Sequence, residues 1–233
     1  AFVDDAALLL LADRTLALDA CGTAAESKSA EQIEAEMKAQ REQMLRVLRA
    51  SSDADHLLVA AMLSWKDQSE QAMEMLGRAA AADPRNPMIA SQALELCLVV
   101  DTCDRSPATL ERDLIAADKA NGLAWAQVAS SRLKRSDEAG ALAAMREAAA
   151  APVIDEYFIE YVLLFDRGLA ASTGLETFDR GAAAILHAGG LHSSDPLIVR
   201  DCFERAKYQA EWRDVCLRLA QSFEESSDSY WIR

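Results

Sequence analysis

The fold is decided by the stretch AMEMLGRAAAADP, Ala72–Pro84, which is echoed by ALAAMREAAAAPV at Ala141–Val153. Both stretches carry a small, a large and a small residue at relative positions 0, 4 and 7. These residues are Ala72, Leu76 and Ala79 in the first stretch, and Ala141, Met145 and Ala148 in the second. Residues at this spacing lie on one face of a helix, where small side chains let a second helix approach closely. The two stretches therefore predict a repeated helix in a packed helical array.

The distance between the two stretches indicates a repeat period. Ala141 follows Ala72 by 69 residues, one more than two periods of about 34 residues. Trp125 precedes Ala141 by 16 residues, and Pro84 closes the first stretch. On these residues the chain resembles the tetratricopeptide repeat (TPR) family, in which the tryptophan and the proline are signature positions. The resemblance implies an all-α fold, an α-solenoid of about six antiparallel helix pairs.

Composition also favours helices. Hydrophobic residues make up 51% of the 233-residue chain, but aromatic residues make up only 6%, and alanine dominates the apolar set. Sheets are enriched in aromatic and β-branched residues, whereas alanine is the strongest helix former. Nine glycines and five prolines leave most of the chain free of helix breakers.

The charge and the hydropathy pattern argue against two classes of partner. The formal net charge is −14, so no basic surface is expected that could neutralise the phosphates of a nucleic acid. We expect no membrane insertion, because the apolar run Ala6–Ala12 is far shorter than the roughly 20 residues that a membrane-spanning helix needs.

Three regions are expected along the chain. Residues 1–51 form an irregular N-terminal helix pair or cap, residues 52–225 form the TPR-like repeats, and residues 226–233 are a C-terminal tail. The first helix of the cap is predicted over Phe2–Cys21. Its residues in helical register are Leu8, Leu11, Ala12, Thr15, Leu16 and Asp19. The helix predicted over Asp155–Leu169 is apolar on nearly all sides, so we expect it to be buried centrally.

The five cysteines suggest two disulfides. Cys202 and Cys216 lie seven residues before and after Gln209, the predicted turn of the last helical hairpin, and Phe203 and Leu219 on the same stripe are expected to face inward. Cys97 and Cys103 span a helix end and its loop, and they leave Cys21 without a partner. Two such pairs favour an oxidising compartment, periplasmic or secreted. The alternative is a cytoplasmic protein with free cysteines that pack as small hydrophobes.

No catalytic, cofactor-binding or metal-binding residues are predicted. The histidines are His56, His187 and His192, and none has the helical i, i+4 spacing or the paired cysteines of a metal site. The sequence contains no glycine-rich phosphate loop, nucleophile elbow or dinucleotide fingerprint. We therefore expect no enzyme and no cofactor.

The TPR resemblance implies a non-catalytic protein–protein interaction or scaffold module that binds a peptide or a partner helix in a concave groove. Carried over from the family, the groove positions are Leu57, Ala61, Ser64, Trp65, Met88, Ser91, Glu95, Leu98, Leu123, Ser130 and Lys134. Trp65 is the best anchor, because aromatic residues dominate binding hot spots. Alternatively, Trp65 belongs to the core, or the tail residues Tyr230, Trp231 and Ile232 fill the groove. Two further alternatives are an all-helical enzyme whose pocket the sequence does not reveal, and the N-terminal structural part of a longer polypeptide.

Overall fold

The computed structural model describes residues 29–65, 67–100, 103, 105–191 and 195–226. Over these ranges it is all-α, with eleven helices and no strand, as predicted. The predicted helix Phe2–Cys21, together with His192 and the tail residues 227–233, lies outside the described residues. Within them, no helix is long and apolar enough to cross a membrane.

The helices are α2 (Ala30–Arg49), α3 (Ala54–Ser64), α4 (Ser69–Ala82), α5 (Pro87–Val99), α6 (Pro107–Asp118), α7 (Gly122–Lys134), α8 (Glu138–Ala150), α9 (Phe158–Ser172), α10 (Thr177–Leu191), α11 (Asp195–Ala206) and α12 (Ala210–Ser226).

Local sequence signals set where the helices begin. Ser29 forms a capping box with Gln32 at the start of α2, and the Asp53 carboxylate accepts a hydrogen bond from the backbone N–H of His56 at the start of α3. Ser106 caps α6, with Pro107 at its first position. These side chains satisfy backbone N–H groups that have no partner within the helix. A capping residue read from the sequence therefore marks the start of each of these three helices.

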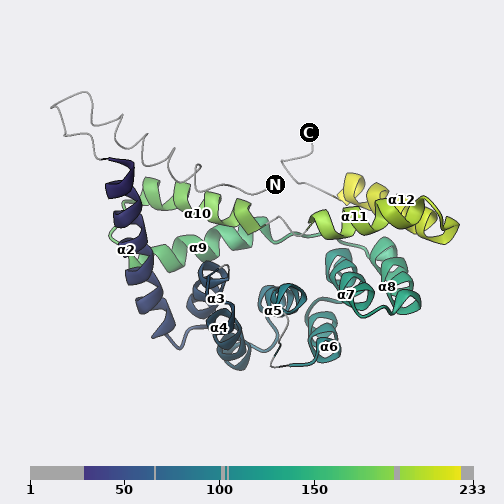
Figure 1. Ribbon diagram of the computed structural model, residues 1–233, viewed down its shortest axis with the longest axis horizontal. Coiled ribbons are helices and arrows are strands. Elements are labelled where there is room, and N and C mark those ends of the chain that lie inside the picture. Colours follow the sequence, from purple (N-terminus) through teal and green to yellow (C-terminus); the bar gives the residue numbers. More distant parts are fainter. Residues whose placement is uncertain (1–28, 66, 101–102, 104, 192–194, 227–233) are drawn as a thin grey trace.

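Consecutive helices from α3 onward pack in pairs, and the pairs occupy two layers. Helices α3 to α8 lie along one side of the molecule, and α9 to α12 lie across them (Figure 1). Helix α9 packs on α2 and α3, while α11 packs on α7 and α12 on α8. The chain thus turns back after α8, and α9 returns to the helices near the beginning of the described chain.

The central helix is α3, not α9. Residues 57–64 of α3 are all buried, because α2, α4 and α9 pack around this helix. The expectation that the Asp155–Leu169 helix is buried centrally was wrong: Ile159 is 58% exposed and Leu163 is 52% exposed. The reason is that α9 has an apolar face against α2 and α3 and another apolar face that no described helix covers.

Close contacts hold α9 on the first layer. Gly168 lies directly over Val59, where a Cβ atom would come within 3.1 Å of both γ carbons of the valine. The buried hydroxyl of Tyr161 accepts a hydrogen bond from Nε2 of Gln92 on α5 at 3.1 Å, and burial raises the pKa of this tyrosine. The Arg167 guanidinium pairs with Asp55 at 2.5 Å. Helix α9 therefore binds α3 and α5 through both packing and polar contacts.

Both predicted cysteine pairs lie at disulfide-bonding distance. The Cα atoms of Cys97 and Cys103 are 5.5 Å apart, and those of Cys202 and Cys216 are 5.8 Å apart, within the range that a disulfide spans. Leu219 is buried as expected, but Phe203 is 64% exposed, so its predicted inward position was wrong. The core of this hairpin is instead formed by Trp212, Val215 and Leu219, all from α12.

Candidate functional site

The groove residues carried over from the TPR family lie at very different depths. Four of them are buried, namely Leu57, Ala61, Ser64 and Ser91, and one, Lys134, is exposed. The other six are half-buried; these are Trp65, Met88, Glu95, Leu98, Leu123 and Ser130. Trp65, Met88 and Leu123 pack against the core. The structure therefore does not bring these side chains together on one open surface.

Several of these residues already have partners within the chain. The Ser64 hydroxyl accepts a hydrogen bond from the Arg49 guanidinium on α2 and donates one to the Ala60 carbonyl. The Ser91 hydroxyl donates to the side-chain oxygen of Gln127 on α7. A ligand could reach the buried members only if the helices that cover them moved away.

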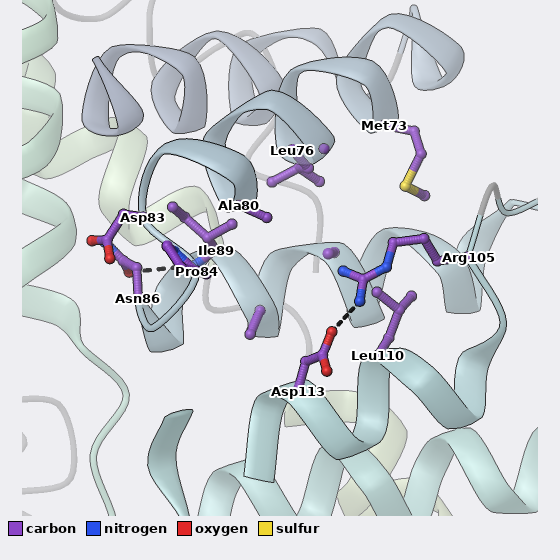
Figure 2. A pocket seen from close by; sticks show the side chains of 13 residues that line it. Met73, Leu76, Ala80, Asp83, Pro84, Asn86, Ile89, Arg105, Leu110 and Asp113 are labelled. Carbon is purple, nitrogen blue, oxygen red and sulfur yellow. Dashed lines mark hydrogen bonds and ion pairs between the residues drawn. The ribbon is translucent and has the colours of Figure 1, made fainter. Parts of the chain in front are cut away.

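An open cavity lies elsewhere, between α4, α5 and α6 (Figure 2). It has a volume of about 200 Å³. It is lined by Met73, Leu76, Gly77, Ala80, Asp83, Pro84, Asn86, Ile89, Ala90, Ala93, Arg105, Leu110 and Asp113. The first part of this lining comes from the stretch Ala72–Pro84, on which the repeat prediction rests.

Helical register explains the apolar wall of the cavity. Met73, Leu76 and Ala80 of α4 fall three and four residues apart, on one side of the helix. Gly77 lies between them, and a Cβ atom added there would meet no atom within 4 Å. The absence of a side chain at Gly77 therefore leaves space at this wall.

The rim of the cavity is polar. The Arg105 guanidinium is ion-paired with the Asp113 carboxylate of α6, as Figure 2 shows. Arg105 lies two residues after Cys103, which is bonded to Cys97 of α5, and one residue before the α6 cap Ser106. The side-chain oxygen of Asn86 accepts hydrogen bonds from the backbone N–H groups of Met88 and Ile89. The rim is thus held by both neighbouring helices, and Arg105, Asp113 and Asn86 already have partners within the chain.

Most of the residues that line the cavity are apolar. They include no cysteine, histidine, serine or lysine, and their ionisable groups are Asp83, Arg105 and Asp113. Because Arg105 and Asp113 pair with each other, the chemistry that the cavity offers is the burial of an apolar group.

Ionisable groups elsewhere fit structural roles. The buried Glu111 carboxylate accepts a hydrogen bond from Ser131 at 2.6 Å and pairs with Arg132 and Arg135, which joins α6 to α7. Burial raises the pKa of Asp118, and the Tyr157 hydroxyl donates a hydrogen bond to that carboxylate. Among the described residues, no three histidine, cysteine or acidic side chains are grouped as a metal would require.

Burial raises the pKa of two further carboxyl groups near Asp118, those of Asp155 and Glu156. Asp155 accepts a hydrogen bond from the backbone N–H of Tyr157, whose φ of 55° lies in the left-handed region. This arrangement forms the turn that leads into α9, three residues later than the sequence predicted.

The cavity was not predicted from the sequence. One residue in the sequence hints at the cavity, and this is Gly77, which lies inside a strongly predicted helix. A glycine there destabilises the helix, so its presence often has a packing or functional reason. The register of Met73 and Ala80 shows that they share a face, but only the positions of α5 and α6 show that this face stays partly uncovered.

The comparisons with known proteins found no match: no protein-family model fits the chain, and neither the curated proteins nor the solved structures include a significantly similar one.

Proposed function

We propose that this chain is a non-catalytic protein-interaction module in which residues 53–151 form a TPR-like array of helix pairs. The cavity between α4, α5 and α6 receives one apolar side chain from a helical segment of the partner. The observation that carries the proposal is an open apolar cavity at whose rim Arg105 is already paired with Asp113. The proposed binding surface therefore differs from the concave groove that the TPR resemblance implies. Several residues of that groove are buried by the chain's own helices.

The size of the cavity favours a side chain over a free small molecule. Pockets for small-molecule ligands usually measure about 300–1,000 Å³, whereas this cavity has about 200 Å³. A large apolar side chain gains about 1.5–3 kcal/mol from full burial, which suits a single anchor in a helix-in-groove interface.

The charge of the chain favours a basic partner segment. The net charge is −14, and Asp83 adds a carboxylate to the cavity lining in addition to the Arg105–Asp113 pair. Complementary charge steers the encounter between two proteins and selects against acidic partners. The proposed ligand is therefore a helix with one leucine or phenylalanine anchor and flanking lysines or arginines.

Filling the cavity is expected to abolish this binding. Gly77→Phe adds a ring at a position where a Cβ atom meets nothing, so the fold should tolerate it while the ring occupies the space. The measurement is NMR titration of the full chain with a panel of helical peptides, each with one leucine, phenylalanine or tryptophan anchor between lysines. The Met73 and Ile89 methyl signals should shift, and Gly77→Phe should weaken the affinity at least about tenfold.

The matched control is Ala82→Phe, which adds the same ring at an exposed position of α4 that does not line the cavity. It should bind peptide as the wild type does. The proposal fails if no peptide in the panel shifts the two methyl signals, or if the two variants bind equally well.

We also propose that the protein works in an oxidising compartment, periplasmic or secreted. Support comes from the two cysteine pairs at bonding distance, since such disulfides are rare in the cytosol. Freshly isolated protein, unfolded and alkylated without reductant, should therefore be labelled at Cys21 alone. Labelling of all five cysteines would contradict the proposal.

A further inference from the structure

Asp83 places a carboxylate at one end of the cavity between α4, α5 and α6. It follows the last residue of α4 and lines the cavity together with Pro84 and Asn86. Among the described residues, no group forms a hydrogen bond or an ion pair with this carboxylate. Arg85, the nearest arginine in the sequence, is exposed and does not line the cavity. The carboxylate can therefore bind a cation from outside the chain.

The other end of the cavity has no such uncompensated charge. Figure 2 shows Asp83 and Asn86 at one end of the cavity, and Met73 and Arg105 at the other. The Arg105 guanidinium is ion-paired with the Asp113 carboxylate, so these two charges largely cancel. The ionisable residues that line the cavity are Asp83, Arg105 and Asp113. The lining thus has one uncompensated charge, and this charge lies at one end.

The end of helix α4 adds to the negative charge beside Asp83. The last turn of α4 contains no basic residue, and the carbonyl groups at the C-terminus of a helix carry a partial negative charge. The N-terminus of α5 lies close by, but the Asn86 side chain already accepts hydrogen bonds from the backbone N–H groups of Met88 and Ile89. This end of the cavity therefore favours a cation.

The distance from the cavity wall to Asp83 determines where a partner helix would carry that cation. Gly77 leaves space in the wall of α4, and Asp83 follows it by six residues, about 9 Å along the helix axis. On a partner helix laid along α4, a residue four positions from the anchor shares the anchor's face and lies about 6 Å from it along the axis. The ammonium group of a lysine, on its flexible four-carbon stem, can span the remaining distance.

We propose that Asp83 orients the partner helix by pairing with one lysine or arginine that lies four residues from the apolar anchor. This inference rests on the proposed function, because it requires that the cavity receives the anchor. It adds that the end of the partner helix that carries this cation lies at Asp83. A second cation, on the other side of the anchor, contributes little, because it faces the Arg105–Asp113 pair.

A charge swap tests the pairing. Two helical peptides share one leucine anchor and otherwise uncharged positions, and carry either a lysine or a glutamate four residues before the anchor. In NMR titrations, the wild type should bind the lysine peptide about two- to fivefold more tightly than the glutamate peptide, the usual range for an exposed ion pair. Asp83→Asn should remove this preference, and Asp83→Lys should reverse it. The matched control is Glu147→Gln, which removes one negative charge at an exposed position of α8 outside the cavity. It should keep the preference of the wild type.

A spin label tests the orientation. Two further peptides carry the single lysine four residues before or four residues after the anchor, and each has a nitroxide at the end nearest its lysine. Ile89 lies three residues after Asn86, near the Asp83 end, whereas Met73 lies at the far end (Figure 2). Both labelled peptides should broaden the Ile89 methyl signal more than the Met73 methyl signal. The opposite order with either peptide would overturn the proposal.

The outcomes separate this inference from the proposed function. If no peptide shifts the Met73 and Ile89 methyl signals, the cavity is not a binding site and both proposals fail. If the peptides bind but Asp83→Asn and Asp83→Lys keep the preference of the wild type, the binding site stands and Asp83 does not orient the partner. Loss of the preference in Glu147→Gln would assign it to the net charge of the chain, which also contradicts the inference.

Discussion

Gly122→Ala is expected to lower the free energy of unfolding by about 1–3 kcal/mol, the usual range for overpacking in a tight site. Gly122 is the first residue of α7, and its backbone N–H donates to the Val153 carbonyl at 2.8 Å. A Cβ atom there would lie 2.7 Å from the Ala148 carbonyl oxygen and would also overlap the Ile154 side chain. Because the carbonyl belongs to the backbone at the end of α8, the clash cannot be relieved by turning a side chain. Urea unfolding, with the transition slope compared between variants, measures the change.

Gly77→Ala is the control for this prediction. It makes the same chemical change in the interior of α4, at a position where a Cβ atom meets nothing. It should raise the free energy of unfolding by about 0.5–1 kcal/mol, because alanine loses less backbone entropy than glycine on helix formation. A Gly122→Ala variant as stable as the wild type would mean that the segment after α8 does not cross the start of α7 as described.

Short-range features of this fold could be predicted from the sequence. Ser29, Asp53 and Ser106 mark helix starts because each side chain bonds to a backbone group only two or three residues away. The Cys202–Cys216 pair could be inferred from symmetry about one turn. Both inferences depend on local geometry, which the sequence determines strongly.

Long-range features could not be predicted in the same way. The apolar content of the α9 segment shows that this helix must pack against another helix. It does not show that this other helix is α3, which lies about a hundred residues earlier. The contact with α3 depends on Gly168 lying over Val59, and the hydrogen bond between Tyr161 and Gln92 joins α9 to α5. Phe203 shows the same limit, because its register predicted burial but no helix among the described residues covers it.

The candidate site depends on this long-range packing as well. The packing of α2 and of the returning helix α9 on α3 buries Leu57, Ala61 and Ser64, which the repeat pattern assigns to a groove. The cavity beside Gly77 depends instead on where α6 lies after the Cys97–Cys103 loop. The repeat pattern predicts which residues share a helix face, and tertiary packing decides which of those faces remain open.

Acidification from pH 7.5 to pH 5 should destabilise the protein through His187, by about 1–2 kcal/mol from this residue alone. His187 of α10 stacks on the Phe165 ring with their centroids 5.1 Å apart. Burial, with a smaller effect from the Arg41 guanidinium, lowers its pKa from 6.5 to about 4. The unfolded chain therefore binds a proton near pH 6.5, whereas the folded chain stays neutral until about pH 4. The stability that depends on neutral His187 is complete above pH 6.5, falls as the pH drops towards 4, and changes no further below that.

His187→Phe isolates this contribution, because a second ring can keep the stacking on Phe165 but cannot take up a proton. Burial raises the pKa of Asp118, Asp155, Glu156 and Asp201, so protonation of these groups stabilises the folded chain as the pH falls. That opposing effect is common to both proteins and cancels when the variant is compared with the wild type at each pH. The stability of His187→Phe relative to the wild type should therefore rise by about 1–2 kcal/mol between pH 7.5 and pH 5. If the difference between the two proteins is the same at both pH values, His187 is not held neutral against Phe165, and the packing of α10 on α9 described here is wrong at this position.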